Sequence, residues 1–161
     1  MKKDKQILSH LNIEGNPQMV DVSAKVATAR IATAEAIVSF PAKVFKQLLE
    51  NNFLSSKGSI FHTAIIAGTM GAKRTADLIP LCHPLQLSTI NIDVETGVNE
   101  LKITATVKCE GKTGVEMEAL MAASIAALTV YDMCKALSHD IVIAQTKLIV
   151  KKGGKSDFKS Y

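Results

Sequence analysis

The short stretch of residues 72–85 contains several side chains that can bind a ligand or transfer a proton, together with two prolines. Pro80 and Pro84 fix their own backbone angles and push the residues before them toward extended geometry, which predicts a rigid connector. The stretch carries two fixed cations, a carboxylate, a thiol and an imidazole: Lys73, Arg74, Asp77, Cys82 and His83. This combination favours a binding or catalytic site over a plain loop that closes a helix, in which Cys82 would be buried as a small apolar residue.

Three other segments combine lysine with glycine: residues 55–58, 111–114 and 151–155. Glycine lets a backbone approach a ligand, and free backbone amides at a helix start bind anions. We expect Lys57 and Lys112 to lie at helix N-termini and, with Lys73 and Arg74, to bind a multiply charged anion such as a phosphate ester. The phosphate-binding motif Gly-x-x-x-x-Gly-Lys-Ser/Thr is absent. Each segment taken alone is more typical of a solvated loop, whereas all of them together are as typical of a binding site as of solvated loops.

A long apolar helix expected over residues 115–137 carries the remaining candidates. Asp132 and Lys135 are three residues apart, so they are neighbours on the helix surface. They are an acid/base pair if desolvated, or otherwise an ordinary surface ion pair. Glu118 and Asp132 lie on one helix face, within about 40° of each other, but roughly 21 Å apart along the axis. One small substrate can therefore contact both carboxylates only if two subunits combine.

The elements that position these residues alternate between strands and helices. Strands are expected at 24–40, 85–94, 100–109 and 141–150, and helices at 41–50, 60–75 and 115–137. This order predicts a single α+β domain of ferredoxin-like type, an antiparallel sheet with helices packed on one face. Residues 1–18 are expected to be a flexible N-terminal tail, 19–158 the domain with a basic glycine-rich tail at 151–157, and 159–161 the C-terminal end.

Composition excludes several classes of protein. The 161 residues are 47% hydrophobic, which excludes a disordered chain, and the net charge of +4 favours an anionic ligand. Three cysteines and scattered histidines show no zinc-binding spacing, so we expect no metal site. The expected strands lack the paired aromatics of an RNA-binding sheet. No signal peptide and no apolar run of roughly 20 residues is found, so we expect a cytoplasmic protein that binds neither nucleic acid nor membrane.

Long motifs of this chain closely resemble the molybdenum cofactor biosynthesis protein C family, the cyclic pyranopterin monophosphate synthases. The resemblance runs from about residue 19 to residue 158, with its segments in family order. It is carried by residues 19–25 (MVDVSAK), 72–85 (AKRTADLIPLCHPL), 111–120 (GKTGVEMEAL), 128–135 (LTVYDMCK) and 152–156 (KGGKS).

The resemblance implies a lyase that converts 3′,8-cyclo-7,8-dihydro-GTP into cyclic pyranopterin monophosphate with release of pyrophosphate. It implies that a radical-SAM GTP cyclase supplies the substrate, and that the enzyme is a homohexamer, a trimer of dimers with its site between subunits. No cofactor is implied, although a divalent cation can accompany the substrate phosphates. The implied catalytic residues are Asp132, Lys57 and Lys135, and the implied substrate-binding residues are Leu81, Cys82, His83, Met117, Glu118, Lys73, Arg74 and Lys151.

The chain departs from the family pattern at two places. Ser59-Ile60 stands where the family commonly has Asp-Val, and Ser156 runs directly into Asp157 where a glycine is usual. Two other classes of function remain open at this stage. One is a non-catalytic module that binds an anion or nucleotide beside a partner enzyme, and the other is a nucleic-acid binder.

Overall fold

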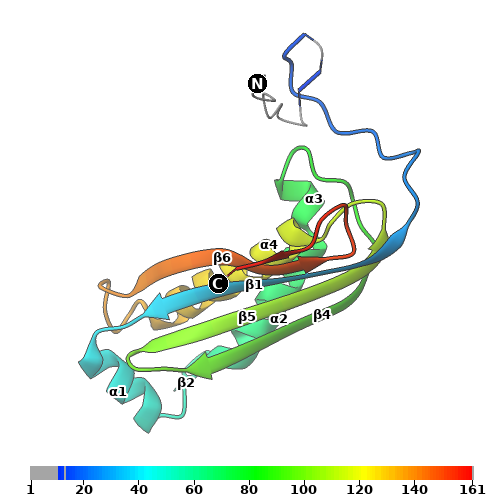
Figure 1. The fold of residues 1–161 in the computed structure, drawn as a ribbon. Helices are drawn as coiled ribbons and strands as arrows, with labels where there is room; N and C mark the ends of the chain where they lie inside the picture. Colours follow the sequence, from blue (N-terminus) through cyan, green and yellow to red (C-terminus); the bar gives the residue numbers. More distant parts are fainter. Residues whose placement is uncertain (1–10, 13, 161) are drawn as a thin grey trace, which may run out of the picture.

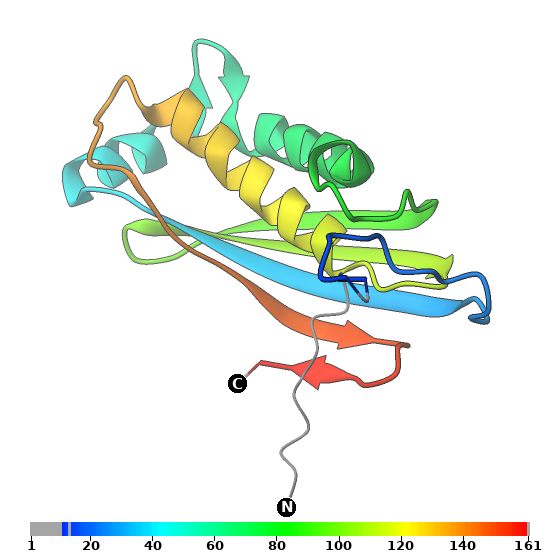
Figure 2. The same ribbon diagram turned by 90° about the horizontal axis from the view of Figure 1, so that it is seen from above.

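A five-stranded antiparallel sheet with helices on one face forms the body of the protein in this computed structural model (Figures 1 and 2). The structure describes residues 11–12 and 14–160, so most of the tail expected at 1–18, and the last residue of the end expected at 159–161, lie outside the described residues. The strand order β4-β5-β1-β6-β7 confirms the predicted α+β, ferredoxin-like arrangement. The strands are β1 (Thr28–Ser39), β2 (Leu54–Ser55), β3 (Gly58–Ser59), β4 (Leu87–Thr96), β5 (Glu100–Gly111), β6 (Val142–Lys152) and β7 (Phe158–Lys159), and the helices are α1 (Ala42–Glu50), α2 (Ile60–Lys73), α3 (Thr75–Leu78) and α4 (Glu116–Cys134).

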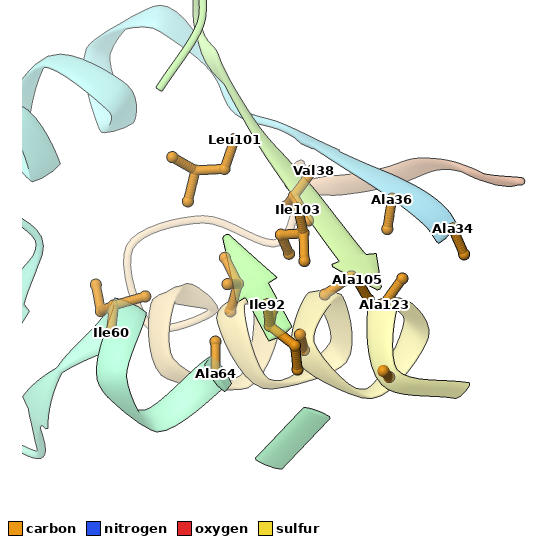
Figure 3. Packing of buried hydrophobic residues seen from close by; sticks show 14 of the residues in the cluster. Ala34, Ala36, Val38, Ile60, Ala64, Ile92, Leu101, Ile103, Ala105 and Ala123 are labelled. Carbon is orange, nitrogen blue, oxygen red and sulfur yellow. The ribbon is translucent and has the colours of Figure 1, made fainter. Parts of the chain in front are cut away.

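Strand β1 is the centre of the sheet, paired antiparallel with β5 on one side and β6 on the other. Every second residue of β1 faces the helices and is fully buried from Ala32 to Val38, because successive side chains of a strand point to opposite faces. Small alanines on this face let α4 approach the sheet closely. Helix α4 presents buried alanines of its own, such as Ala119, and Figure 3 shows Ala123 among them. The core is therefore built from small side chains at short range.

Helices α2 and α4 pack against each other through glycines of α2. A Cβ placed on Gly68 would come within 2.7 Å of the Ala122 carbonyl oxygen, and one on Gly71 within 2.8 Å of Ile125. The small residues of α2 permit this close packing, and α4 is the surface that they meet. By length and composition α4 is apolar enough to cross a membrane, which the sequence did not lead us to expect. Its packing against β1, β5, β6 and α2 identifies it as the core helix.

The structure differs from the predicted elements mainly where glycine turns the chain. Residues 151–157 are predicted as a tail, but β6 runs on to Lys152 and the chain folds back as β7. The reversal depends on Gly153, whose φ of +86° favours glycine. The sequence also gave no sign of the hairpin β2–β3 or of α3, and it placed the end of α4 three residues too late. Ser59 caps α2 by accepting a hydrogen bond from the His62 backbone N–H.

Candidate active site

A cavity of about 680 Å³ lies beside the first turn of α4, next to the start of β1 and the ends of β5 and β6. Six of the residues expected to bind substrate line it: Leu81, Cys82, His83, Met117, Glu118 and Lys151. They come from three separate parts of the chain, the proline-bounded connector, α4 and β6. The fold thus brings together residues that are far apart in the sequence and that only the family resemblance had assigned to one site.

The cavity is strongly basic. Its lining includes two carboxylates, Glu116 and Glu118, against five basic side chains: Lys25, Arg30, Lys112, Lys151 and Lys155. Clustered cations in a cleft attract a polyanion and stabilise negative charge that develops during a reaction. The site therefore has the electrostatics required to bind a di- or triphosphate.

Arg30 is a site residue that the sequence reasoning missed. It lies on β1 with the same parity as the buried residues Ala32 to Val38, at the end of the strand where the core gives way to the cavity. Its Nε donates a hydrogen bond to the Gly111 carbonyl at 3.2 Å, which fixes the guanidinium relative to the loop before α4. The sequence did contain a signal for Arg30, because a cation at a position of β1 that faces the core indicates that the core ends there.

Glu118 is the buried carboxyl group of the cavity, with only 4% of its surface exposed. Burial raises its pKa above the ordinary range, and the nearby charge of Glu116 raises it further. Burial, and then Glu118, likewise raise the pKa of the Cys82 thiol. Cys82 is consequently a neutral thiol rather than a nucleophile, and Glu118 is the group here whose pKa is displaced toward neutrality, as proton transfer requires.

The first turn of α4 is held to β6 by an ion pair. Glu116 Oε1 lies 3.2 Å from Lys151 Nζ, and both side chains are mostly buried. A Cβ at Gly114 would collide with the Glu116 carboxylate, so glycine at this position leaves the room that the carboxylate occupies. The pair sets where the Lys151 ammonium lies on the wall of the cavity.

The three residues expected to be catalytic form a second cluster. Asp132 Oδ1 lies 2.7 Å from Lys135 Nζ, and Oδ2 lies 3.8 Å from Lys57 Nζ. The hydrogen bond and charge of Lys135, followed by the charge of Lys57, lower the pKa of Asp132, and the Asp132 carboxylate in turn raises the pKa of Lys135. All three side chains are at least half exposed. The Asp132–Lys135 pair is therefore not desolvated, and the cluster is an open carboxylate held between two cations.

The two clusters lie at opposite ends of α4. The β2–β3 hairpin lies beside the C-terminal end of α4 (Figure 2), and Lys57 is in the turn of this hairpin. The cavity adjoins the N-terminal end of α4. The 14 residues from Glu118 to Asp132 span roughly 21 Å of helix. The distance derived from the sequence holds in the structure, because α4 runs without interruption between these two residues.

The four cations that the sequence predicted to bind an anion lie elsewhere than expected. Arg74 Nε is 3.5 Å from the Asp77 carboxylate, and neither Lys73 nor Arg74 lines the cavity of its own chain. The stretch of residues 72–85 is thus divided, with only its second half at the cavity. Lys57 and Lys112 precede α2 and α4 by three or four residues rather than occupying their first turns, because a hairpin and a loop intervene. Across residues 11–12 and 14–160, no three His, Cys, Asp or Glu side chains are grouped to hold a metal ion.

Comparison with known proteins identifies a close set of relatives. Residues 19–154 match the model of the MoaC family. The chain is 57% identical over 151 residues to the cyclic pyranopterin monophosphate synthase of Xanthomonas campestris pv. campestris strain B100, covering 93% of this chain and 92% of that protein. It is 56% identical to the enzyme of the same name from Xanthomonas oryzae pv. oryzae strain MAFF 311018, with the same coverage. It is also 51% identical to part of molybdenum cofactor biosynthesis protein 1 of Drosophila melanogaster, covering 94% of this chain and 27% of that protein.

Proposed function

This chain belongs to the MoaC family and is a lyase of molybdenum cofactor biosynthesis, and we propose that it converts 3′,8-cyclo-7,8-dihydro-GTP into cyclic pyranopterin monophosphate and pyrophosphate. The structural observation that carries the proposal is the basic cavity of about 680 Å³, which has the size of a nucleotide site and an excess of cations. A radical-SAM GTP cyclase would supply the substrate, and we expect the enzyme to act in the cytoplasm.

The chemistry of cyclic phosphate formation explains the need for cations. A hydroxyl oxygen of the sugar-derived part attacks the α-phosphorus, the bond to the bridging oxygen breaks, and pyrophosphate leaves with the bonding electrons. The proton of the attacking hydroxyl passes to a base. We assign to Arg30, Lys151 and Lys155, which line the cavity, the stabilisation of the charge that grows on the leaving pyrophosphate.

We assign the remaining roles by cluster. Leu81, Cys82 and His83 of the connector, with Met117 and Glu118 of α4, contact the base-derived part of the substrate. Asp132, Lys57 and Lys135 carry out proton transfer and charge stabilisation. Lys73 and Arg74 reach the triphosphate only if they come from a neighbouring subunit, because they lie outside the cavity of their own chain.

We propose a homohexamer, a trimer of dimers with the site between subunits. This assembly explains how the cavity and the Asp132 cluster can serve one substrate. Asp132 and the cavity of one chain are too far apart for one small substrate, so a second chain must bring its Asp132 cluster to the cavity of the first. Large apolar side chains on the helices support such contacts: Ile66 and Met70 on α2 and Leu128 on α4 are each more than half exposed.

Turnover of the purified enzyme tests the proposed reaction. The protein is mixed with 3′,8-cyclo-7,8-dihydro-GTP, and both pyranopterin and pyrophosphate are measured. We expect equal amounts of the two products. Binding of the substrate without turnover by folded protein would instead support a non-catalytic nucleotide-binding module.

Mixed oligomers test the position of the site between subunits. Glu118→Ala and Asp132→Ala subunits are each expected to be inactive alone. When unfolded and assembled together, they should regain activity at sites that combine an intact Glu118 with an intact Asp132 from different chains. Mixed oligomers that form but stay inactive would show that both residues must come from one chain.

A further inference from the structure

A segment without helix or strand forms part of the wall of the cavity. Residues 19–25, here called the strap, run alongside it, and Val20, Val22 and Lys25 line it. Within the strap, the backbone N–H and hydroxyl of Ser23 donate to the Asp21 carboxylate, and the Lys25 N–H donates to the Val22 carbonyl. The strap therefore has a defined local shape, but no ladder of backbone hydrogen bonds attaches it to the sheet.

A single side chain joins the strap to the body of the protein. Lys112 Nζ donates to the Ser23 carbonyl oxygen at 2.8 Å, and among the described residues this is the hydrogen bond between the strap and the rest of the chain. Lys112 follows directly on Gly111, whose carbonyl accepts the hydrogen bond from Arg30. One short loop thus holds both the strap and the arginine of the cavity.

The direction of the Lys112 side chain argues against its being a simple phosphate ligand. Its ammonium group is engaged with a backbone carbonyl, and a hydrogen bond from a charged donor is stronger than one between neutral groups. The carboxylate of Asp21 shapes the turn that presents this carbonyl, and the charges of Lys112 and His83 act on it. The strap, whose turn is shaped by its own Asp21, is thus held beside the connector by Lys112.

We propose that Lys112 is a positioning residue that fastens the strap against the cavity, so that Val20 and Val22 form its outer wall over a bound substrate. The role of this wall in turnover depends on the proposed function, whereas the fastening itself does not. An apolar wall excludes water from the polar site and strengthens the electrostatic interactions inside it. The basic pattern of the sequence had suggested instead that Lys112 binds phosphate directly.

Limited proteolysis tests the fastening without any substrate. Trypsin cleaves after lysine, and the Lys25–Val26 bond lies where the strap meets an exposed residue, since Val26 is 80% exposed. In Lys112→Met, cleavage at Lys25, identified by mass spectrometry, should accelerate by roughly tenfold through loss of one charge-assisted hydrogen bond. Lys112→Arg should restore protection, and Lys108→Met, which removes an exposed lysine of β5, should cleave like the wild type. Wild-type protection in Lys112→Met would overturn the proposal.

Kinetics then separate positioning from direct binding of phosphate. We expect Lys112→Met to raise KM by about tenfold while kcat changes by less than about twofold. Asp21→Ala should raise KM in the same way, and the double variant should be no worse than the more affected single variant, because both changes release the same strap. Effects that multiply in the double variant would show that Lys112 acts on the substrate independently. A wild-type protein that fails to turn over would contradict the proposed function but leave the proteolysis result intact.

Discussion

The turn after β6 depends on Gly153, and replacing this residue by alanine should detach the last hairpin. The φ of +86° is strained for any residue with a Cβ. In addition, a Cβ at this position would collide with the Ala29 carbonyl oxygen, which belongs to the backbone and cannot rotate away. The Gly153 carbonyl oxygen accepts a hydrogen bond from the Thr28 hydroxyl at 2.9 Å, and the Gly153 N–H donates one to the Asp157 carboxylate at 3.1 Å.

These contributions set the size of the effect. The left-handed backbone costs about 1–2 kcal/mol, and displacement of the two hydrogen bonds adds about 1 kcal/mol each. Gly153→Ala should therefore lower the free energy of unfolding by roughly 3–4 kcal/mol, unless β7 separates from β6 first and limits the loss. At about 2–4 °C per kcal/mol for a chain of this size, we expect the Tm to fall by roughly 6–16 °C. Because Lys151 and Lys155 flank the turn and line the cavity, KM should rise as well.

Two other glycines serve as controls for this substitution. Gly58 has a φ of +105° with no atom within 4 Å of an added Cβ, so Gly58→Ala measures the backbone strain without a collision. At Gly154, an added Cβ would meet only the end of the flexible Arg30 side chain, so Gly154→Ala should be mild. Thermal unfolding is followed at one fixed protein concentration, because oligomerisation shifts the Tm. If Gly153→Ala unfolds at or above the Tm of Gly58→Ala and keeps the wild-type KM, the reasoning from the Ala29 contact is refuted.

Three further predictions follow from the charged groups. Asp132→Asn should lower kcat by at least about 100-fold yet leave the Tm nearly unchanged, because its ion pairs are half exposed; a large loss of Tm would indicate a structural role instead. Burial raises the pKa of Glu118 above the ordinary value of 4.5, so its contribution to stability is present below that value and is lost as the pH rises through the pKa of the folded state. Glu118→Gln should accordingly stabilise the protein at pH 8 more than at pH 5, and a Tm difference independent of pH would contradict the raised pKa. Turnover should persist in excess EDTA, because Arg30, Lys151 and Lys155 of the cavity can neutralise the phosphates; complete loss of activity that Mg²⁺ restores would show that a metal ion is required.

The sequence predicted the sheet and the main helices because their patterns are local. The alternation in β1 and the helical spacing in α1 appear within a few residues. The hairpin β2–β3 and strand β7 were missed because each has only two residues per strand, too few for any period to appear. Their formation depends on Gly58 and Gly153, whose positive φ angles favour a reversal but do not reveal which strands it joins.

The site was predicted residue by residue, but its arrangement was not. Motif resemblance selected Leu81, His83 and Glu118, which the structure does gather around one cavity. It also grouped Lys73 and Arg74 with them, since adjacency in sequence does not show that α3 would separate these cations from the connector. Arg30 was overlooked because its parity in β1 marks it as a core position, and only the end of the core at that point makes the arginine accessible.

The state of Asp132 in the free enzyme has a consequence for its role. Lys135 and Lys57 lower its pKa, so the carboxylate is ionised and is a weak base while both cations contact it. The contact with Lys57 is the longer of the two, 3.8 Å against 2.7 Å, and Lys57 projects from a short hairpin rather than from α4. A polyanionic substrate that draws the Lys57 ammonium toward its phosphates removes one of the charges that lower the pKa of Asp132. In the proposed mechanism, substrate binding would thereby make Asp132 a stronger base at the moment when a proton must be accepted.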